Sequence, residues 1–143
     1  MSHITLTNVR KAFGAKKVLN GVKLSVEKGH SLVVIGGSGT GKSVMLKCIL
    51  GILQPEAGEI VVDGQNVVGL KGKARDDYLQ HFGMLFQGSA LFDSLPVWEN
   101  VAFGLTHGRN VPRAKAKDIA IEKLSQVGLS AEVGKLYPAE LSG

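Results

Sequence analysis

The sequence of 143 residues predicts an α/β fold, and three observations support this prediction. Apolar and polar residues alternate over 3–9, and a second strand pattern follows over 18–26, as in half-buried strands. An uninterrupted apolar run over 30–35 leads through a glycine-rich octet to apolar residues at helical spacing over 42–50, and Gly51 is expected to end this helix. Apolar residues also share one face of a longer predicted helix over 112–127. Strands and helices thus follow one another within about one domain length.

Composition excludes several classes of protein. With 44% hydrophobic residues, the chain can bury a core and is neither disordered nor fibrous. No apolar run approaches the length of a membrane span, and residues 1–13 lack the apolar stretch of a secretory signal, so we expect a cytosolic protein. The single cysteine, Cys48, cannot form an internal disulfide and is expected to be a packed thiol.

The first two predicted strands are expected to pair as an antiparallel ribbon that carries the excess positive charge. The formal net charge is +5, and residues 1–28 hold six basic residues against one acid, whereas residues 29–143 hold equal numbers of each. Lysines in this segment alternate with apolar residues, which indicates a solvated strand face. Basic and aromatic residues are not interleaved, so the sequence predicts no nucleic-acid partner.

The glycine-rich octet at 36–43 predicts a phosphate-binding loop between the strand at 30–35 and the helix at 42–50. Its sequence fits G-x-x-x-x-G-K-[ST], in which glycines let backbone N–H groups surround a β-phosphate. Lys42 is expected to reach the β and γ oxygens and Ser43 to ligate Mg²⁺, while the helix directs its N-terminus at the same anion. The alternative is an accidental glycine-rich turn, with a chance on the order of one or two per cent. The candidate nucleotide-binding residues are Gly36, Gly37, Ser38, Gly39, Thr40, Gly41, Lys42 and Ser43.

A second antiparallel excursion is predicted after the loop helix. Residues 54–58 form a turn and 59–62 a strand, which Asp63-Gly64 ends. Alternatively, the run 60–63 resembles a shortened Walker B strand, which would make the chain a small complete P-loop protein. Because Glu59 interrupts the apolar run and Gly64 follows the acid, we prefer the Asp-Gly turn.

The C-terminal half is predicted to be mainly helical. We expect a polar helix over 73–81, a short apolar strand over 83–87 and a helix over 95–103 with Pro96 in its first turn. The amphipathic helix over 112–127 should end at Gly128. Its predicted buried face consists of Ala116, Ala120, Ile121, Leu124 and Val127.

Three further features lie at suggestive distances from the loop. Phe13 lies 29 residues before Lys42, Gln87 lies 45 residues after it, and Leu-Ser-Gly occupies 141–143. This combination resembles the nucleotide-binding subunits of ABC transporters. By this resemblance Phe13 is the adenine-stacking aromatic, 36–43 is Walker A, Gln87 is the Q-loop glutamine, and 141–143 begin the signature motif.

The resemblance implies an ABC ATPase core, a P-loop NTPase, with an N-terminal antiparallel β subdomain and part of the α-helical subdomain. The whole chain, 1–143, is then a partial ABC ATPase domain that is truncated within the signature. Its expected parts are 1–30 and 59–70 for the β subdomain, 31–53 and 82–87 for the P-loop core, and 88–143 for the Q-loop and incomplete helical subdomain.

Residues 84–103 permit a narrower match. They are similar to the ATPases that work with Mce-type lipid-binding proteins in the Mla phospholipid-trafficking and toluene-tolerance systems. The stretch Gln-Gly-Ser-Ala-Leu-Phe-Asp-Ser-Leu at 87–95 distinguishes this subgroup, and 127–129 and 135–138 agree more weakly. Pro96 departs from the small polar residue that is usual at its position.

The resemblance implies an ATP-binding subunit that couples ATP binding and hydrolysis to phospholipid transport across the bacterial inner membrane and envelope. ATP and Mg²⁺ are the expected cofactors, with Lys42 and Gln87 catalytic and Ser43 and Gln87 at the Mg²⁺. Ser142 and Gly143 are expected to contact the γ-phosphate of ATP held by a second ATPase subunit. The other implied partners are a permease, through residues 88–107, and an Mce-type protein. The expected location is the cytoplasm, peripheral to the inner face of the inner membrane.

Two alternatives remain open. In the first, the chain is the ATPase subunit of another ABC importer, for amino acids or metals. In the second, it is a P-loop interaction module whose basic ribbon binds an anionic partner without ATP hydrolysis. Counterparts of Walker B, the catalytic glutamate, the D-loop and the switch histidine are not found in the sequence. We therefore expect ATP hydrolysis from the full-length protein, and better binding than hydrolysis from these 143 residues alone.

Overall fold

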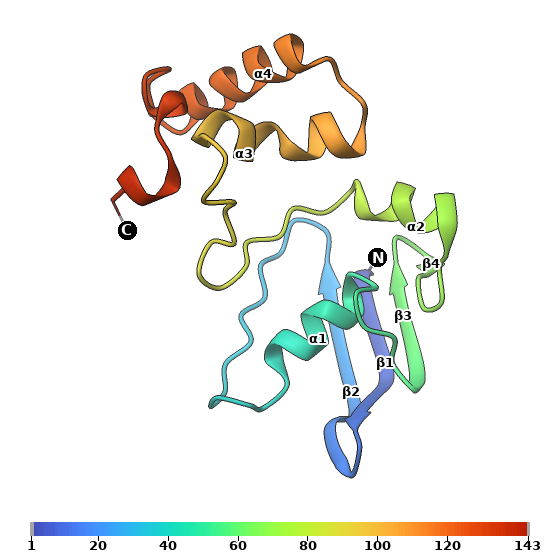
Figure 1. Ribbon diagram of the computed structural model, residues 1–143. Coiled ribbons are helices and arrows are strands. Elements are labelled where there is room, and N and C mark those ends of the chain that lie inside the picture. The colour runs from blue at the N-terminus through green and yellow to red at the C-terminus, as the bar shows by residue number, and fades with distance from the viewer. Residues whose placement is uncertain (1, 143) are drawn as a thin grey trace. The chain divides into compact units, whose positions relative to one another are not determined.

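The computed structural model describes residues 2–142, and the chain divides into two compact units, Met1–Met84 and Leu85–Gly143 (Figure 1). The first unit contains a four-stranded sheet and two helices, and the second is helical. Within the described residues, no helix is long and apolar enough to cross a membrane.

The sheet of the first unit is antiparallel and has the strand order β2-β1-β3-β4. Its strands are β1 (Ser2–Phe13), β2 (Lys16–Glu27), β3 (Ala57–Val62) and β4 (Gln65–Asn66). The predicted ribbon of two strands is therefore confirmed, with both strands longer than the alternating patterns. The second predicted excursion is also confirmed, because β3 pairs with β1 on one side and turns into β4 on the other.

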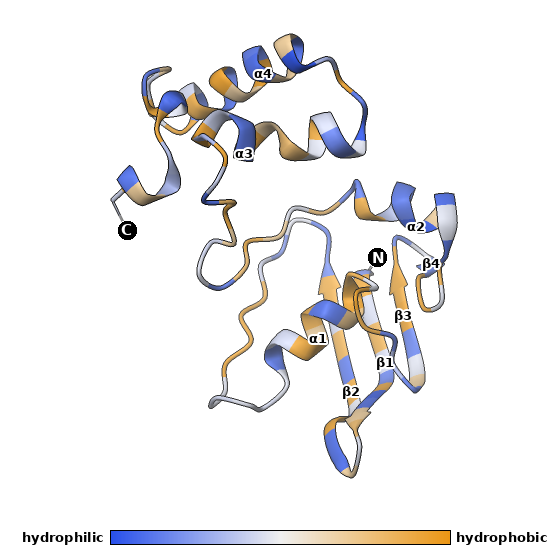
Figure 2. Ribbon diagram, in the orientation of Figure 1, coloured by the Kyte–Doolittle hydropathy of each residue, from blue (hydrophilic) through white to orange (hydrophobic). Residues whose placement is uncertain are grey.

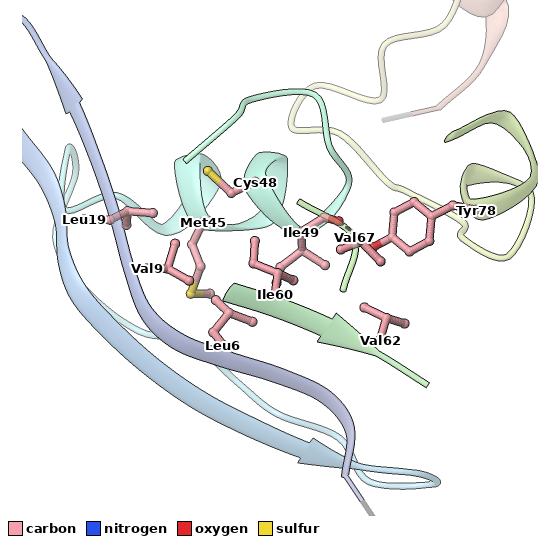
Figure 3. Packing of buried hydrophobic residues seen from close by; sticks show 10 residues of the cluster. All are labelled: Leu6, Val9, Leu19, Met45, Cys48, Ile49, Ile60, Val62, Val67 and Tyr78. Atoms are coloured by element: carbon pink, nitrogen blue, oxygen red, sulfur yellow. Dashed lines mark hydrogen bonds between the residues drawn. The ribbon is translucent and has the colours of Figure 1, made fainter. Parts of the chain in front are cut away.

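Helix α1 (Lys42–Ile49) packs on one face of this sheet and closes the core of the first unit (Figure 3). Apolar and polar residues are interspersed along β1 and β2, whereas β3 ends in an apolar run, Ile60 to Val62 (Figure 2). Helix α2 (Gly72–Leu79) adds Tyr78 to this core. The buried cluster comprises Leu6, Val9, Leu19, Met45, Cys48, Ile49, Ile60, Val62, Val67 and Tyr78. Cys48 is a buried thiol, as predicted, and burial raises its pKa.

The predicted helix stop at Gly51 is formed by local backbone geometry. Gly51 has a φ of 67°, and its N–H donates to the carbonyl of Cys48 at 3.1 Å. The N–H of Ile52 donates to the carbonyl of Lys47 at 2.9 Å. This pair of hydrogen bonds is a Schellman motif, which satisfies carbonyls at the helix end. Gly128 ends helix α4 (Arg113–Gln126) in the same way.

The second unit is built on the packing of α3 (Val97–Phe103) against α4. A π-helical segment, η1 (Gly104–Gly108), continues α3, and two short 3-10 turns follow α4, η2 (Val133–Lys135) and η3 (Pro138–Glu140). The buried cluster consists of Trp98, Ala102, Ala116 and Ala120. Three of these four residues are alanines, whose small side chains let the two helices approach closely.

Both C-terminal helices are shorter than predicted. Pro96 and Pro112 occupy the N-cap positions, before the first helical turn, because their extended ψ angles of 160° and 138° differ from the helical value. The helix predicted from residue 95 therefore begins at Val97. Val127 caps α4 and is 71% exposed, so its assignment to the buried face is wrong.

The strands predicted at 30–35 and 83–87 are not formed. Both segments lack strand structure, and Ile35 and Leu85 are 88% and 84% exposed. An apolar run becomes a strand only where a neighbouring strand supplies hydrogen-bond partners. Within the described residues, the four strands of the sheet pair only with one another, and neither run belongs to that sheet. Apolar composition alone therefore predicted these two elements wrongly.

Candidate functional site

The glycine-rich loop joins the extended segment 31–35 to the N-terminus of α1. Gly41 is the N-cap residue, with φ 97° and ψ 4°, and no side chain caps the helix. The first turn of α1 also carries no acidic side chain. The N–H groups at this helix end, together with the positive end of the helix dipole, are therefore suited to an anionic ligand.

Strand β2 fixes the position of this helix end through a close approach at Gly41. A Cβ atom on Gly41 would lie 3.0 Å from the carbonyl oxygen of Val18 and 3.0 Å from the side chains of Val18 and Leu19. Lys11 pairs with Leu19 and Ala12 with Lys17, so Val18 is the extra residue of a β-bulge. The bulge brings two consecutive residues of β2 against the loop, so a Cβ atom at residue 41 would be crowded by them.

The side chain of Lys42 is folded onto the loop backbone. Its Nζ donates to the carbonyl oxygens of Gly36 at 2.7 Å and Gly37 at 2.6 Å, and lies 3.4 Å from the Thr40 hydroxyl. The Thr40 hydroxyl in turn donates to the carbonyl of Gly37 at 2.8 Å. The positive charge is thus held at the loop, where phosphate oxygens could replace the neutral carbonyls as acceptors.

Phe13 and the loop line one pocket, although they are far apart in the sequence. The pocket has a volume of about 290 Å³ and is lined by Phe13, Lys16, Val18 and residues 39–44. The ring of Phe13 is at the end of β1, is 48% exposed, and has the Lys11 ammonium 5.3 Å from its centroid. A planar base can stack on such a ring while its phosphates lie at the helix N-terminus. The lining residues therefore fit a nucleoside phosphate.

The structure does not bring every predicted site residue to this pocket. Gly36 and Gly37 contribute backbone carbonyls to Lys42, and Ser38 is exposed in the turn that follows. Gln87 and Ser142 belong to the second compact unit, where both are exposed. Gly143 lies outside the described residues. The roles of these residues toward a nucleotide remain predictions.

Lys16 and Val18 line the pocket but were not identified from the sequence. The available signal was the hairpin itself, because Lys16 is the cross-strand partner of Phe13. A two-residue turn at Gly14-Ala15 is enough to infer the pairing of residue 13 with residue 16. The bulge at Val18 could not be inferred from the sequence, since no residue type in 17–19 requires a bulge.

Asp63 lies in the turn between β3 and β4, as the preferred interpretation of that segment predicts. It has a φ of 47°, its N–H donates to the carbonyl of His3 at 2.9 Å, and its carboxylate pairs with the His3 ring. A second pocket of about 550 Å³ adjoins this pair and is lined by β3, α2 and residues beside them. Within residues 2–142, no group of three or more His, Cys, Asp or Glu side chains is arranged to hold a metal ion.

The chain resembles several transporter ATP-binding proteins. A family model described as ABC transporter matches residues 19–143. The chain is 38% identical over 140 residues to the probable ribonucleotide transport ATP-binding protein mkl of Mycobacterium tuberculosis, and this match covers 98% of the chain and 39% of that protein. It is 36% identical over 140 residues to the intermembrane phospholipid transport system ATP-binding protein MlaF of Haemophilus influenzae, covering 98% and 53%.

A third relative is named for yet another cargo. The methionine import ATP-binding protein MetN of Caulobacter vibrioides is 43% identical over 143 residues, covering 98% of the chain and 42% of that protein. The chain thus spans about half or less of the length of these relatives. Among solved structures, the ATP-binding cassette MJ0796, as a dimer in a post-hydrolysis state bound to ADP and Pi, superposes with a TM-score of 0.82 at 27% identity. That superposition covers 97% of this chain and 63% of the cassette.

Proposed function

The chain belongs to the ABC transporter family, and on this premise we propose that it is the nucleotide-holding part of an ATP-binding subunit that drives phospholipid transport. The observation that carries the proposal is the pocket in which Phe13 meets the loop and the N-terminus of α1. The base of ATP stacks on the Phe13 ring, and the loop N–H groups and Lys42 bind the phosphates.

Binding of the triphosphate requires Lys42 to exchange its acceptors. In the structure its ammonium bonds to two loop carbonyls, and in the complex it bonds to β- and γ-phosphate oxygens. This exchange replaces neutral acceptors by charged ones and therefore favours the bound state. Ser43 lines the same pocket, and its hydroxyl would hold Mg²⁺ there. The ion would supply positive charge that neutralises the phosphates.

Residues 88–107 are the proposed contact with a permease. Residues 88–96 form a loop before α3, and the exposed side chains of Leu91 and Phe92 offer an apolar surface on it. The Asn100 side chain holds this loop in place, since it accepts from the Phe92 N–H at 2.7 Å and donates to the carbonyls of Phe92 and Leu95 at 3.1 and 3.0 Å. A loop with a fixed backbone and apolar side chains suits transmission of force to a membrane partner.

Phospholipid is the proposed cargo, and methionine is the second candidate. Similarity to MlaF and the stretch at 87–95 support phospholipid, whereas the higher identity to MetN favours a methionine importer. Overall identity is a weak guide to cargo, because the nucleotide site that dominates this chain is the same for either cargo. The two candidates are distinguished by assembling the full-length subunit with its permease in vesicles. Phospholipid transfer supports the first, and methionine uptake supports the second.

The proposed assembly contains two ATP-binding subunits. The solved relative MJ0796 is a dimer, which supports a second copy as partner. We further propose that Ser142 and Gly143 of one subunit contact the nucleotide of the other, that Gln87 contacts Mg²⁺ and the γ-phosphate, and that an Mce-type protein belongs to the wider complex. The proposed location is the cytoplasmic face of the bacterial inner membrane.

The decisive test of the nucleotide site is Lys42→Ala. We expect Mg²⁺-dependent ATP binding, measured by calorimetry, to be lost, because the variant removes the cation that neutralises the β- and γ-phosphates. Lys47→Ala is the matched control, since it removes the same charge from the last turn of the same helix. Unchanged ATP affinity in Lys42→Ala would refute the proposed function.

A further inference from the structure

The nucleotide pocket contains a further cation, Lys16, besides Lys42. Three lysines lie near the Phe13 ring and the loop. Lys11 pairs with Glu56 at 3.0 Å, and Lys42 donates to the carbonyls of Gly36 and Gly37. Lys16 is exposed and lines the pocket, and its ammonium has no hydrogen-bond or ion-pair partner among the described residues.

The register of the β1–β2 hairpin places Lys16 beside the aromatic ring, on the strand that also approaches the N-terminus of α1. It is the direct cross-strand partner of Phe13, and such partners project from the same face of a sheet. Further along β2, Val18 contacts the position of Gly41 at the start of α1. Two residues of a strand span about 7 Å, which is within the reach of a lysine side chain. The ammonium can therefore reach a group lying between the base and the loop.

The chemistry of a nucleotide identifies that group. A base stacked on Phe13 is uncharged, and the β- and γ-phosphates are bound by the loop and Lys42. The α-phosphate, next to the ribose, lies between these two ends and carries a negative charge. We propose that Lys16 is a second phosphate-binding cation of this site, which binds the α-phosphate and favours nucleotides over nucleosides. This inference rests on the proposed function.

The expected effect is moderate because the pocket is open to solvent. An exposed ion pair stabilises a complex weakly, whereas a charge-assisted hydrogen bond to phosphate contributes more. Replacing Lys16 by methionine keeps most of the aliphatic stem and removes the charge. We therefore expect affinity for nucleotides to fall by about three- to tenfold. The loss should shrink as salt concentration rises, since salt screens exposed charges.

The test compares Lys16→Met with Lys17→Met. Lys17 is the next residue of β2 and is also exposed, but it does not line the pocket, so its replacement makes the same change in net charge. Affinities for ATP, ADP, AMP and adenosine are measured by calorimetry or by competition with a fluorescent nucleotide. We expect Lys16→Met to weaken all three nucleotides and leave adenosine unchanged. Lys17→Met should change none of the four affinities, and Lys16→Arg, which keeps the positive charge, should retain the wild-type affinities.

Each other outcome overturns the inference in a distinguishable way. If the wild-type chain binds ATP and the Lys16→Met and Lys17→Met variants bind nucleotides with equal affinity, Lys16 does not bind phosphate, while the proposed function stands. If adenosine is weakened as much as AMP, Lys16 acts on the base or on the Phe13 ring. If the wild-type chain binds no nucleotide, the proposed function and this inference fail together. Thermal unfolding of both variants verifies that the hairpin is intact.

Discussion

Replacement of Gly41 by alanine tests whether the contact between β2 and the loop positions the nucleotide site. Gly41 combines two constraints, a left-handed backbone with φ 97° and a close approach to the Val18 carbonyl. Gly39 shares only the first, because its φ is 76° but a Cβ there would meet no atom within 4 Å. Gly39→Ala is therefore a matched control for backbone strain.

The expected losses of stability follow from these two constraints. A left-handed backbone with a Cβ atom costs about 1–2 kcal/mol, and both variants incur this cost. Crowding of a packed region costs about a further 1–3 kcal/mol, and only Gly41→Ala incurs it. The backbone oxygen of Val18 cannot move away freely, since its neighbour Leu19 is buried in the core and paired with Lys11. We expect Gly41→Ala to lose about 2–5 kcal/mol and Gly39→Ala about 1–2 kcal/mol.

The assay is unfolding in urea, monitored through hydrogen exchange of the backbone amides in β2 and α1. These amides report the first unit, whereas fluorescence of Trp98, the only tryptophan, reports the second. The urea midpoints of unfolding are compared after confirming that the slope of unfolding free energy against urea concentration is the same in each protein. Equal losses in the two variants would show that the contact with Val18 does not constrain the loop. A Gly41→Ala protein as stable as the wild type would refute the reasoning altogether.

Two further predictions concern one side chain in each unit. Tyr78 donates to the carbonyl of Ile49 at 2.5 Å, and burial raises its pKa from 10.0 to about 12. Because the Tyr78 phenol ionises at lower pH in the unfolded chain, the wild type should lose stability as pH rises from 10 to 12. Tyr78→Phe should lack this loss and should be about 1–3 kcal/mol less stable than the wild type at neutral pH. Thermal unfolding curves of the two proteins that superimpose at alkaline pH would contradict this prediction. Asn100→Ala should release the loop at 92–96, giving faster amide exchange there and a loss of about 1–2 kcal/mol, and unchanged protection of the Phe92 amide would exclude that role.

Local sequence patterns predicted the features that depend on neighbouring residues in the chain. The glycine octet indicated a loop before a helix because glycine permits the left-handed backbone that Gly39 and Gly41 adopt. Gly51 and Gly128 marked helix ends for the same reason. Alternation of apolar residues predicted the antiparallel strands, since the period of two follows from the strand backbone itself. These features need no knowledge of distant contacts.

Other features were decided only by contacts between distant segments. The apolar runs at 30–35 and 83–87 have the composition of strands, but a strand forms only against a partner, and the sheet does not extend to either run. The sequence by itself determined the glycine-rich loop, the hairpins and the helix stops, because each depends on backbone preferences over a few residues. The tertiary structure decided that the bulge at Val18 meets Gly41 and that Phe13 and Lys16 share a pocket with the loop, because register and packing join residues that the sequence keeps apart.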